Sequence, residues 1–396
     1  MEVQIGEFLT LCLYPGQLGF CETTVTGKRR LKIFFMIMLI PSIANHQGGT
    51  RSIILSPFLF HAINVSLNVF MIHGENMNDR KLLSRSEVLR GWFELIRPPN
   101  LFTVPGDILA GASLAFIPEY RILKLFSVIG ISILLYISGL ILNDYCDRET
   151  DRTERPSRPL PSGRVRPGTS LFVSVLLIST AFSIGFVIDG KKPLPLRLLF
   201  FPQEGVSVFQ VVLILVVLIL LYNGPARRIP WLGFVLMGSC RGLNILFGAA
   251  VCDTNFSREV LYGAGIEALY IVLVSSIAYS EVKNLPAKIY FWLPYIPLFM
   301  LAVMVCFIKI SPLGIGSLIV TIGWISSILR HDKCNTRQLS VVIGNLIRGV
   351  ILIQITIVTI QVSLGNQGKQ YFYLVIVFLL IFFFASRLAG KKFYGS

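Results

Sequence analysis

Residues 124–151 read KLFSVIGISILLYISGLILNDYCDRETD, and this stretch decides the fold. Its first part is apolar, with one charge at Lys124, and is close to the ~20 residues that a helix needs to cross the hydrocarbon of a bilayer. Backbone polar groups in lipid must pair within their own segment, so we expect the apolar part to be a helix. The acidic part marks the place where this helix leaves the membrane.

The rest of the chain repeats this pattern of apolar runs separated by short basic loops. Of its 396 residues, 54% are hydrophobic and 14% are charged, against roughly 45–50% and 25% in average soluble domains. We expect an all-α, polytopic transmembrane helical bundle of about nine or ten spans, and therefore an integral, multi-pass membrane protein. The expected spans are 101–118, 124–143, 169–189, 206–222, 233–252, 260–280, 289–308, 312–329, 340–363 and 370–386.

Lys and Arg are distributed unevenly among the loops. If the segment before the first span is cytoplasmic, the loops on that side carry more than twice as many basic residues as the opposite loops, as the positive-inside rule requires. The acidic end of the second span then faces the cytoplasm. These loops beside membrane lipids account for the net charge of +15, and we expect no nucleic-acid partner because the sequence has no soluble basic module.

The N-terminal segment 1–76 does not follow the pattern, and we treat it as an extension of uncertain fold ahead of a membrane domain at 77–396. Residues 31–40 are too short to span, whereas 53–72 are long enough but carry polar residues, so an eleventh span is an open alternative. Translation from Met77 would remove the extension. The seven cysteines are scattered without CxxC spacing, which indicates structural roles.

Asp144, Asp147 and Asp151 follow the second span at positions i, i+3 and i+7, which share one face of a helix. Three carboxylates on one face repel one another, and more so at a membrane edge, so a cation should compensate them. Mg²⁺ takes oxygen ligands and commonly links one or two carboxylates to a substrate's phosphates. The pattern favours a diphosphate site. The alternative is a solvated polar loop whose acids pair with nearby arginines, namely Arg148, Arg152, Arg155 and Arg158.

The segment RPSRPLPSGR at 155–164 cannot form a regular helix because proline recurs every two or three residues. We expect an ordered loop next to the acids. Planar guanidinium groups suit phosphate oxygens, so Arg155 and Arg158 are candidates either to bind a diphosphate or to anchor the loop to lipid headgroups.

The stretch NDYCDRETD followed by RPSRPLPSGRV resembles the first aspartate motif and following loop of the UbiA-type intramembrane prenyltransferases. The resemblance extends to Arg97-Pro98-Pro99-Asn100 and Tyr222-Asn223-Gly224-Pro225. It implies a helical bundle with an aspartate-lined cavity that moves a prenyl group from a prenyl diphosphate to an aromatic or other lipophilic acceptor, with Mg²⁺ as cofactor. Carried over to this chain, it implies metal-binding and catalytic roles for Asp144, Asp147 and Asp151, and substrate-binding roles for Asn100, Asn143 and Tyr222.

The family's second motif, an aspartate pair, should fall near 276–288, and this chain lacks it. Glu281 is the candidate for one metal ligand there, and Lys283 is the candidate for a direct contact with the diphosphate. The chain also resembles a divergent EboC-like branch through 239–244 and 280–282, and that branch is associated with secondary metabolites.

Some charged and amide residues lie inside expected spans and should face the bundle interior, because they are costly in lipid; they include Arg241, Asn244, Glu267 and Arg348. Arg241 and Asn244 share a face and either bind substrate in the cavity or hold helices together. Glu267 and Arg348 are better explained as contacts between helices.

Two main functional hypotheses follow. The first is an enzyme, a Mg²⁺-dependent prenyltransferase in a bacterial inner membrane or a plastid membrane, with a mitochondrial membrane also open. The second is a membrane binder or carrier of a lipophilic diphosphate or secondary metabolite that has lost turnover with the second motif. A secondary transporter is less favoured, since the two halves of the chain show no clear repeat.

Overall fold

The computed structural model describes residues 84–116, 121–189, 206–252, 256–282, 292–308, 312–331, 336–364 and 369–393. Within these residues every regular element is a helix, which confirms the all-α class. The extension at 1–76 and Lys283 lie outside the described residues, as does the side chain of Glu281. The division into an extension and a membrane domain stays a prediction.

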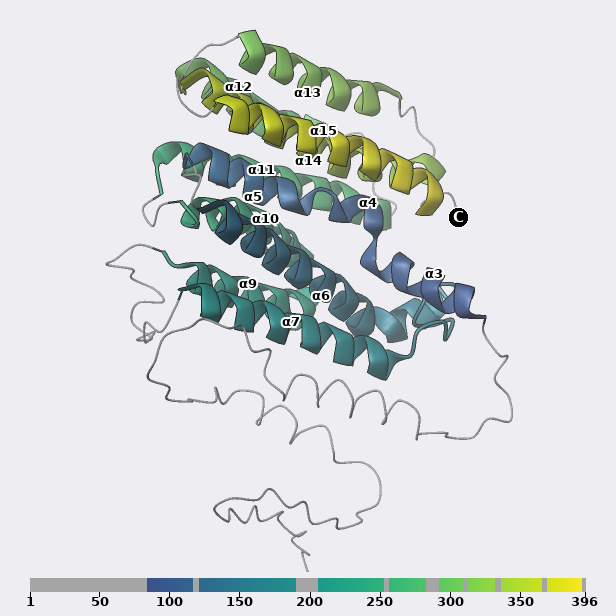
Figure 1. Ribbon diagram of the computed structural model, residues 1–396. Helices are drawn as coiled ribbons and strands as arrows, with labels where there is room; N and C mark the ends of the chain where they lie inside the picture. The colour runs from purple at the N-terminus through teal and green to yellow at the C-terminus, as the bar shows by residue number, and fades with distance from the viewer. Residues whose placement is uncertain are drawn as a thin grey trace, which may run out of the picture. The chain divides into compact units, whose positions relative to one another are not determined.

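The helices lie side by side, with their axes roughly parallel to one another (Figure 1). Their bounds are α3 Arg85–Ile96, α4 Pro98–Leu101, α5 Val104–Leu114, α6 Ile122–Glu154, α7 Pro167–Asp189, α9 Val208–Asn223, the short 3-10 helix η2 Pro225–Arg228, α10 Pro230–Ala250, α11 Arg258–Val282, α12 Tyr295–Ile308, α13 Pro312–His331, α14 Thr336–Leu364 and α15 Lys369–Phe393.

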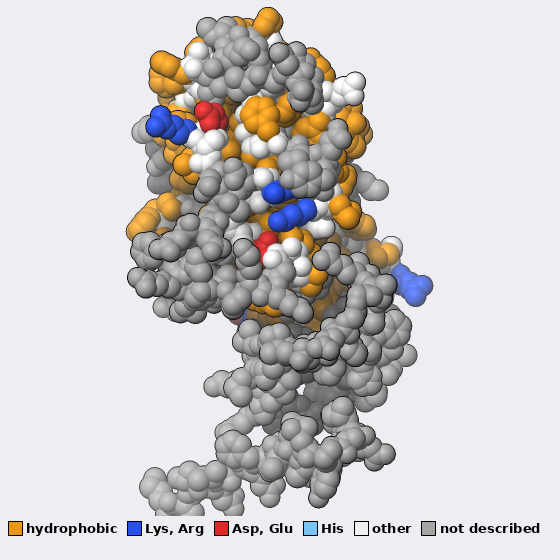
Figure 2. Space-filling view, turned by 60° about the vertical axis from the view of Figure 1, so that its left-hand side comes forward, with side chains coloured by type: hydrophobic (Ala, Val, Ile, Leu, Met, Phe, Trp, Pro, Cys, Tyr) orange, Lys and Arg blue, Asp and Glu red, His pale blue; other side chains and the backbone are white. Residues whose placement is uncertain are grey.

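Seven of the described helices are long and apolar enough to cross a membrane: α6, α7, α10, α11, α13, α14 and α15. Two more, α9 and α12, are apolar but shorter. These nine agree with nine of the ten expected spans. On the face shown in Figure 2, hydrophobic groups predominate among the described side chains. Large hydrophobic side chains are also exposed along the spans, such as Phe126 of α6 and Phe378 of α15, as expected of helices in contact with lipid tails.

The remaining expected span, 101–118, is shorter and interrupted. The chain forms α4 and α5 there, with a break at Phe102 and Thr103. Every residue of α5 is buried, so this helix is surrounded by protein and does not need the length of a lipid-facing span. Buried polar groups satisfy the backbone at the break: the hydroxyl of Thr103 donates to the carbonyl of Asn100 at 2.7 Å.

Helix α5 packs directly against the backbone of α10. A Cβ added at Gly111 would lie 1.9 Å from the carbonyl oxygen of Ile245, and one added at Gly248 would lie 2.1 Å from that of Ile108. Small residues at such crossings let two backbones approach closely in membrane proteins. Helix α14 is the most enclosed of the long helices, with 72% of its apolar window buried.

Candidate active site

Helix α6 continues beyond the apolar span and ends only at Glu154, so the acidic motif lies on a regular helix. Asp144 and Asp151 are each 5% exposed, and Asp147 is partly buried. The predicted common face therefore exists, and it is turned toward protein rather than toward water. Carboxylates in such a place need compensating charge.

Two arginines supply that charge. Arg97 donates from Nη2 to Oδ1 of Asp144 at 2.8 Å, and Arg158 donates from Nη1 to Oδ2 of Asp151 at 2.7 Å. The same Nη1 atom of Arg158 lies 3.9 Å from Oδ1 of Asp144. Arg158 therefore lies at the acidic site, paired with an aspartate as the solvated-loop alternative expected, and its contact with a diphosphate stays a prediction. Arg155 is exposed at the start of the loop.

Arg97 is the residue that sequence reasoning left without a role. It joins α3 to α4 in a left-handed backbone conformation, with φ of 50° and ψ of 65°. The right-handed helical region is disfavoured before a proline, so Pro98 forces α3 to end at this residue. A non-glycine residue in the left-handed region costs roughly 1–2 kcal/mol. This turn brings the guanidinium to Asp144, 47 residues later in the chain.

Asn143 and Tyr222 complete the group of side chains around the motif. The amide of Asn143 donates to Oδ2 of Asp147 at 3.1 Å. Tyr222, at the end of α9, interacts electrostatically with Arg97, Asp147 and Asp144. The structure thus brings together most of the residues that the resemblance implied, although, in the part of the chain that the structure describes, the side chain of Asn100 makes no hydrogen bond to the acids of the motif.

The loop after α6 is held by a second ion pair. Arg164 donates to both carboxylate oxygens of Glu94 on α3, at 2.9 and 2.6 Å. These hydrogen bonds from Arg164, with a smaller contribution from Arg90, hold the pKa of Glu94 below its ordinary value, against the effect of burial. Gly163 has φ of 76°, a left-handed conformation that glycine tolerates. The loop is therefore ordered, as predicted, and it positions Arg158.

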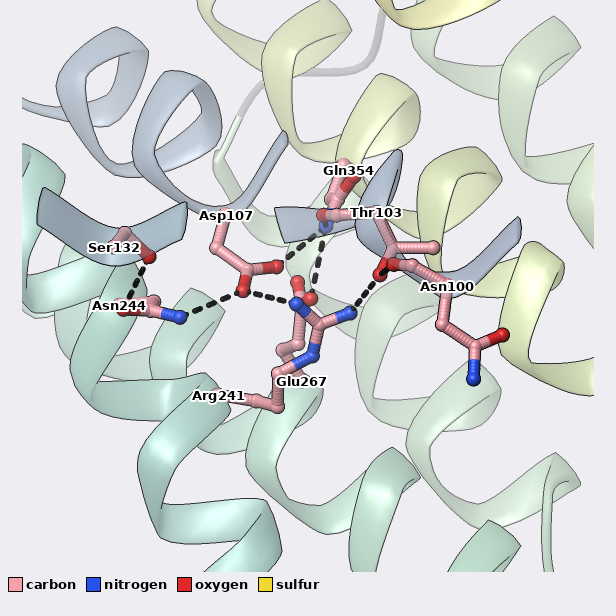
Figure 3. Close-up of polar contacts among 8 residues, drawn as sticks. All are labelled: Asn100, Thr103, Asp107, Ser132, Arg241, Asn244, Glu267 and Gln354. Atoms are coloured by element: carbon pink, nitrogen blue, oxygen red, sulfur yellow. Dashed lines mark hydrogen bonds and ion pairs between the residues drawn. The ribbon is translucent and has the colours of Figure 1, made fainter. Parts of the chain in front are cut away.

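A second polar group lies deeper in the bundle and contains both Arg241 and Asn244 (Figure 3). Arg241 donates to Oδ2 of Asp107 at 2.6 Å, and Asn244 donates to the same oxygen at 3.2 Å. Ser132 of α6 donates to Asn244 at 3.0 Å. Ser132 precedes Asp144 by twelve residues, which is about 18 Å along a helix. Asn244 therefore lies away from the aspartate motif, and the predicted contact of Arg241 and Asn244 with substrate is untested.

The acidic site has the donor chemistry that Mg²⁺ prefers. No three His, Cys, Asp or Glu side chains converge on a point that could hold a metal, as far as the structure describes the chain. Mg²⁺ commonly takes only one or two carboxylates and completes its shell with water and substrate phosphates. Asp144, Asp147 and Asp151 fit an ion that is shared with a diphosphate better than one held in an all-protein cage.

The fold and the site define a class: a multi-pass helical membrane protein with an acidic, arginine-flanked site at the end of one helix. The model of the UbiA prenyltransferase family matches residues 102–393, and the chain belongs to this family.

Curated relatives are similar over part of the chain. A protein named digeranylgeranylglyceryl phosphate synthase from Thermococcus gammatolerans is 29% identical over 190 residues, 44% of this chain and 62% of that protein. The protein of the same name from Methanococcoides burtonii is 27% identical, over 46% of this chain and 59% of its own. The match thus spans about six tenths of the length of these relatives. Both come from archaea, so they do not support a bacterial or plastid location.

Solved structures of UbiA homologs are also similar. One from Aeropyrum pernix K1 has a TM-score of 0.48 and 17% identity, and the match covers 66% of this chain and 97% of that one. One from Archaeoglobus fulgidus, described as bound to DMAPP and Mg²⁺, has a TM-score of 0.39 and 12% identity over 75% and 98% of the two chains. We draw nothing about function from these distant likenesses.

Proposed function

We propose that this protein is a Mg²⁺-dependent membrane prenyltransferase that transfers a prenyl group from its diphosphate to a lipophilic acceptor. The observation that carries the proposal is the arrangement of three aspartates on one face of α6 with Arg97 and Arg158 against two of them. An acidic face binds a divalent cation, and the adjacent guanidinium groups suit the oxygens of a diphosphate.

The reaction breaks the bond between the allylic carbon and the diphosphate oxygen, and the electron pair leaves with the diphosphate. Bound Mg²⁺ would supply neutralisation of the negative charge that builds on the leaving group. Arg97 and Arg158 are placed to stabilise that charge by hydrogen bonds that are fixed before reaction. The allylic carbon then forms a bond to a nucleophilic atom of the acceptor, and the acceptor loses a proton.

The chemical identity of the acceptor is a more specific part of the proposal. The relatives are named for a digeranylgeranylglyceryl phosphate product, which points to a glyceryl phosphate lipid. An aromatic acceptor, or a secondary metabolite, is the other candidate from the family resemblance. Lys283 and Glu281 are proposed to approach the diphosphate from the end of α11, where the second aspartate pair is absent.

The experiment measures release of inorganic diphosphate by the full chain in lipid nanodiscs. Geranylgeranyl diphosphate is supplied with either geranylgeranylglyceryl phosphate or a panel of aromatic acceptors, with Mg²⁺ present or chelated. We expect metal-dependent release that is lost in Asp147→Asn. Metal-dependent binding of the prenyl diphosphate without any release would contradict turnover and support the carrier hypothesis instead.

A further inference from the structure

The deeper polar group contains two acids and one base within the interior of the bundle. Asp107 and Glu267 are 0% exposed, and Arg241 is 6% exposed. With both acids ionised, these three side chains would carry a net charge of minus one. An uncompensated charge is costly at this depth, whereas a single added proton would make the group neutral.

The two acids differ in the hydrogen bonds that they accept. Asp107 accepts from Arg241 at 2.6 Å, from Gln354 at 2.6 Å and from Asn244 at 3.2 Å. Three donors stabilise a carboxylate strongly. Asp107 is therefore the better hydrogen-bonded of the two acids.

Glu267 has the opposite surroundings. Its Oε1 accepts one bond, from Nε2 of Gln354 at 3.0 Å, and its Oε2 is buried without a hydrogen-bond partner among the described residues. The two carboxylates are neighbours, because the same Nε2 atom lies 2.6 Å from Oδ1 of Asp107. A proton on Glu267 would remove the repulsion between two neighbouring carboxylates.

The same group holds the break between α4 and α5. Arg241 donates to the hydroxyl of Thr103, and Nε2 of Gln354, whose two hydrogens are shared among three acceptors, lies 3.1 Å from the carbonyl oxygen of Thr103. Thr103 in turn holds the carbonyl of Asn100. Helix α4 begins directly after Arg97, whose guanidinium contacts Asp144. The four residues of α4 therefore connect Thr103, which contacts the buried group, to Arg97, which contacts the acidic site.

We propose that Asp107 and Glu267 share one proton, held mainly by Glu267, and that the resulting neutral group positions Arg97 at the aspartate site through α4. Asp107, Glu267, Arg241 and Gln354 are positioning residues here and do not touch the reacting atoms. The positioning role rests on the proposed function, because it is measured as a change in the binding of a prenyl diphosphate.

The groups that face Glu267 come from each helix packed around it. They are Asp107 from α5, Arg241 from α10, Tyr270 from α11 itself and Gln354 from α14. On α12, the hydroxyl of Tyr295 is engaged with Ser326 at 3.1 Å. Tyr270 donates to the carbonyl of Leu346 at 2.8 Å. Asp107 and Arg241 thus remain the charged partners that set the protonation of Glu267.

The test compares two amide substitutions in the full chain in nanodiscs. Glu267→Gln mimics the protonated acid, so we expect binding of geranylgeranyl diphosphate within about threefold of wild type and a melting temperature within about 3 °C. Asp107→Asn removes the carboxylate that accepts from Arg241, and the remaining acid, Glu267, must then lose its proton to supply the counter-charge without an ion pair to Arg241 among the described residues. We expect binding to weaken at least ~10-fold and the melting temperature to fall by roughly 5–15 °C.

Two further readouts separate positioning from general stability. Wild-type affinity for the diphosphate should fall as Glu267 loses its proton at high pH, and Glu267→Gln should remove that part of the pH dependence. The double variant Asp107→Asn with Arg241→Gln restores neutrality, so it should recover part of the melting temperature lost in Asp107→Asn.

Infrared spectroscopy tests the proton without any turnover or ligand. The carbonyl stretch of a protonated carboxylic acid should be present in wild type at neutral pH and absent in Glu267→Gln. If that band is absent and Glu267→Gln is as damaging as Asp107→Asn, the inference is wrong and both acids are ionised. If the band is present but wild type neither binds nor turns over prenyl diphosphate, the proposed function and the positioning role fail while the shared proton stands.

Discussion

The contact between α5 and α10 provides a sharp test of how the bundle holds its acidic site. In Gly248→Ala the new Cβ would lie 2.1 Å from the carbonyl oxygen of Ile108, and Cβ contacts below 3.0 Å essentially do not occur. The two helices must therefore separate by about 1 Å at this crossing. Ile108 directly follows Asp107, and Gly248 lies seven residues after Arg241 on the same face of α10.

The separation would reach the buried ion pair. A 1 Å displacement applied to the 2.6 Å contact between Arg241 and Asp107 takes it beyond hydrogen-bonding distance. Overpacking typically costs about 1–3 kcal/mol, and weakening a hydrogen bond between charged groups costs a further ~1.5–3 kcal/mol. We expect Gly248→Ala to lose several kcal/mol of stability and to bind prenyl diphosphate more weakly.

The assay is thermal unfolding in nanodiscs, with Gly265→Ala on α11 as the matched control. A Cβ at Gly265 meets nothing within 4 Å. Both substitutions gain about 1 kcal/mol of helix propensity, so the difference between them isolates the steric effect. Equal melting temperatures for the two variants, with unchanged diphosphate binding, would refute the close packing of α5 on α10 and its link to the ion pair.

Three further predictions concern the acidic site and its loop. Arg97→Gln removes a charge-assisted hydrogen bond to Asp144, so KM for the prenyl diphosphate should rise ~10–100-fold; an unchanged KM in steady-state assays would show that Arg97 does not serve the site. Chelation of Mg²⁺ should abolish diphosphate release and its re-addition should restore it, and release that persists in chelator would exclude the proposed use of the metal. The pKa of Glu94 is lowered in the folded protein, so its ion pair with Arg164 stabilises above the unfolded pKa of about 4.3 and is lost as pH falls through the lower folded value. Unfolding measured from pH 7 downward should therefore show a stability difference between wild type and Glu94→Gln that disappears in acid, and a pH-independent difference would contradict this role.

The sequence alone was sufficient to predict most of the membrane helices and the acidic face of α6. Hydropathy set the spans because lipid demands long apolar helices, and the spacing of Asp144, Asp147 and Asp151 is local to one helix. It was also sufficient to expect that Arg241, Glu267 and Arg348 are buried, since charge on a spanning helix is costly next to lipid.

Other features could not be predicted because they depend on tertiary contacts. Arg97 reaches Asp144 across 47 residues, and no local pattern pairs them, although Pro98 after it indicates a turn. Gln354 and Asp107 lie in apolar runs, and spacing along one helix cannot reveal a partner on another. The short α5 was missed because hydropathy does not distinguish a helix enclosed by protein from one that faces lipid.

The most direct test of the proposed activity is detection of the prenylated acceptor itself. Wild-type protein and Asp144→Ala, each in nanodiscs with Mg²⁺, are given geranylgeranyl diphosphate with an isotopic label in the prenyl chain, together with geranylgeranylglyceryl phosphate or an aromatic acceptor. The account predicts that mass spectrometry finds the labelled chain covalently attached to an acceptor with wild type and not with Asp144→Ala. Labelled product formed equally by both proteins, or by neither while the wild type binds the diphosphate, would contradict it.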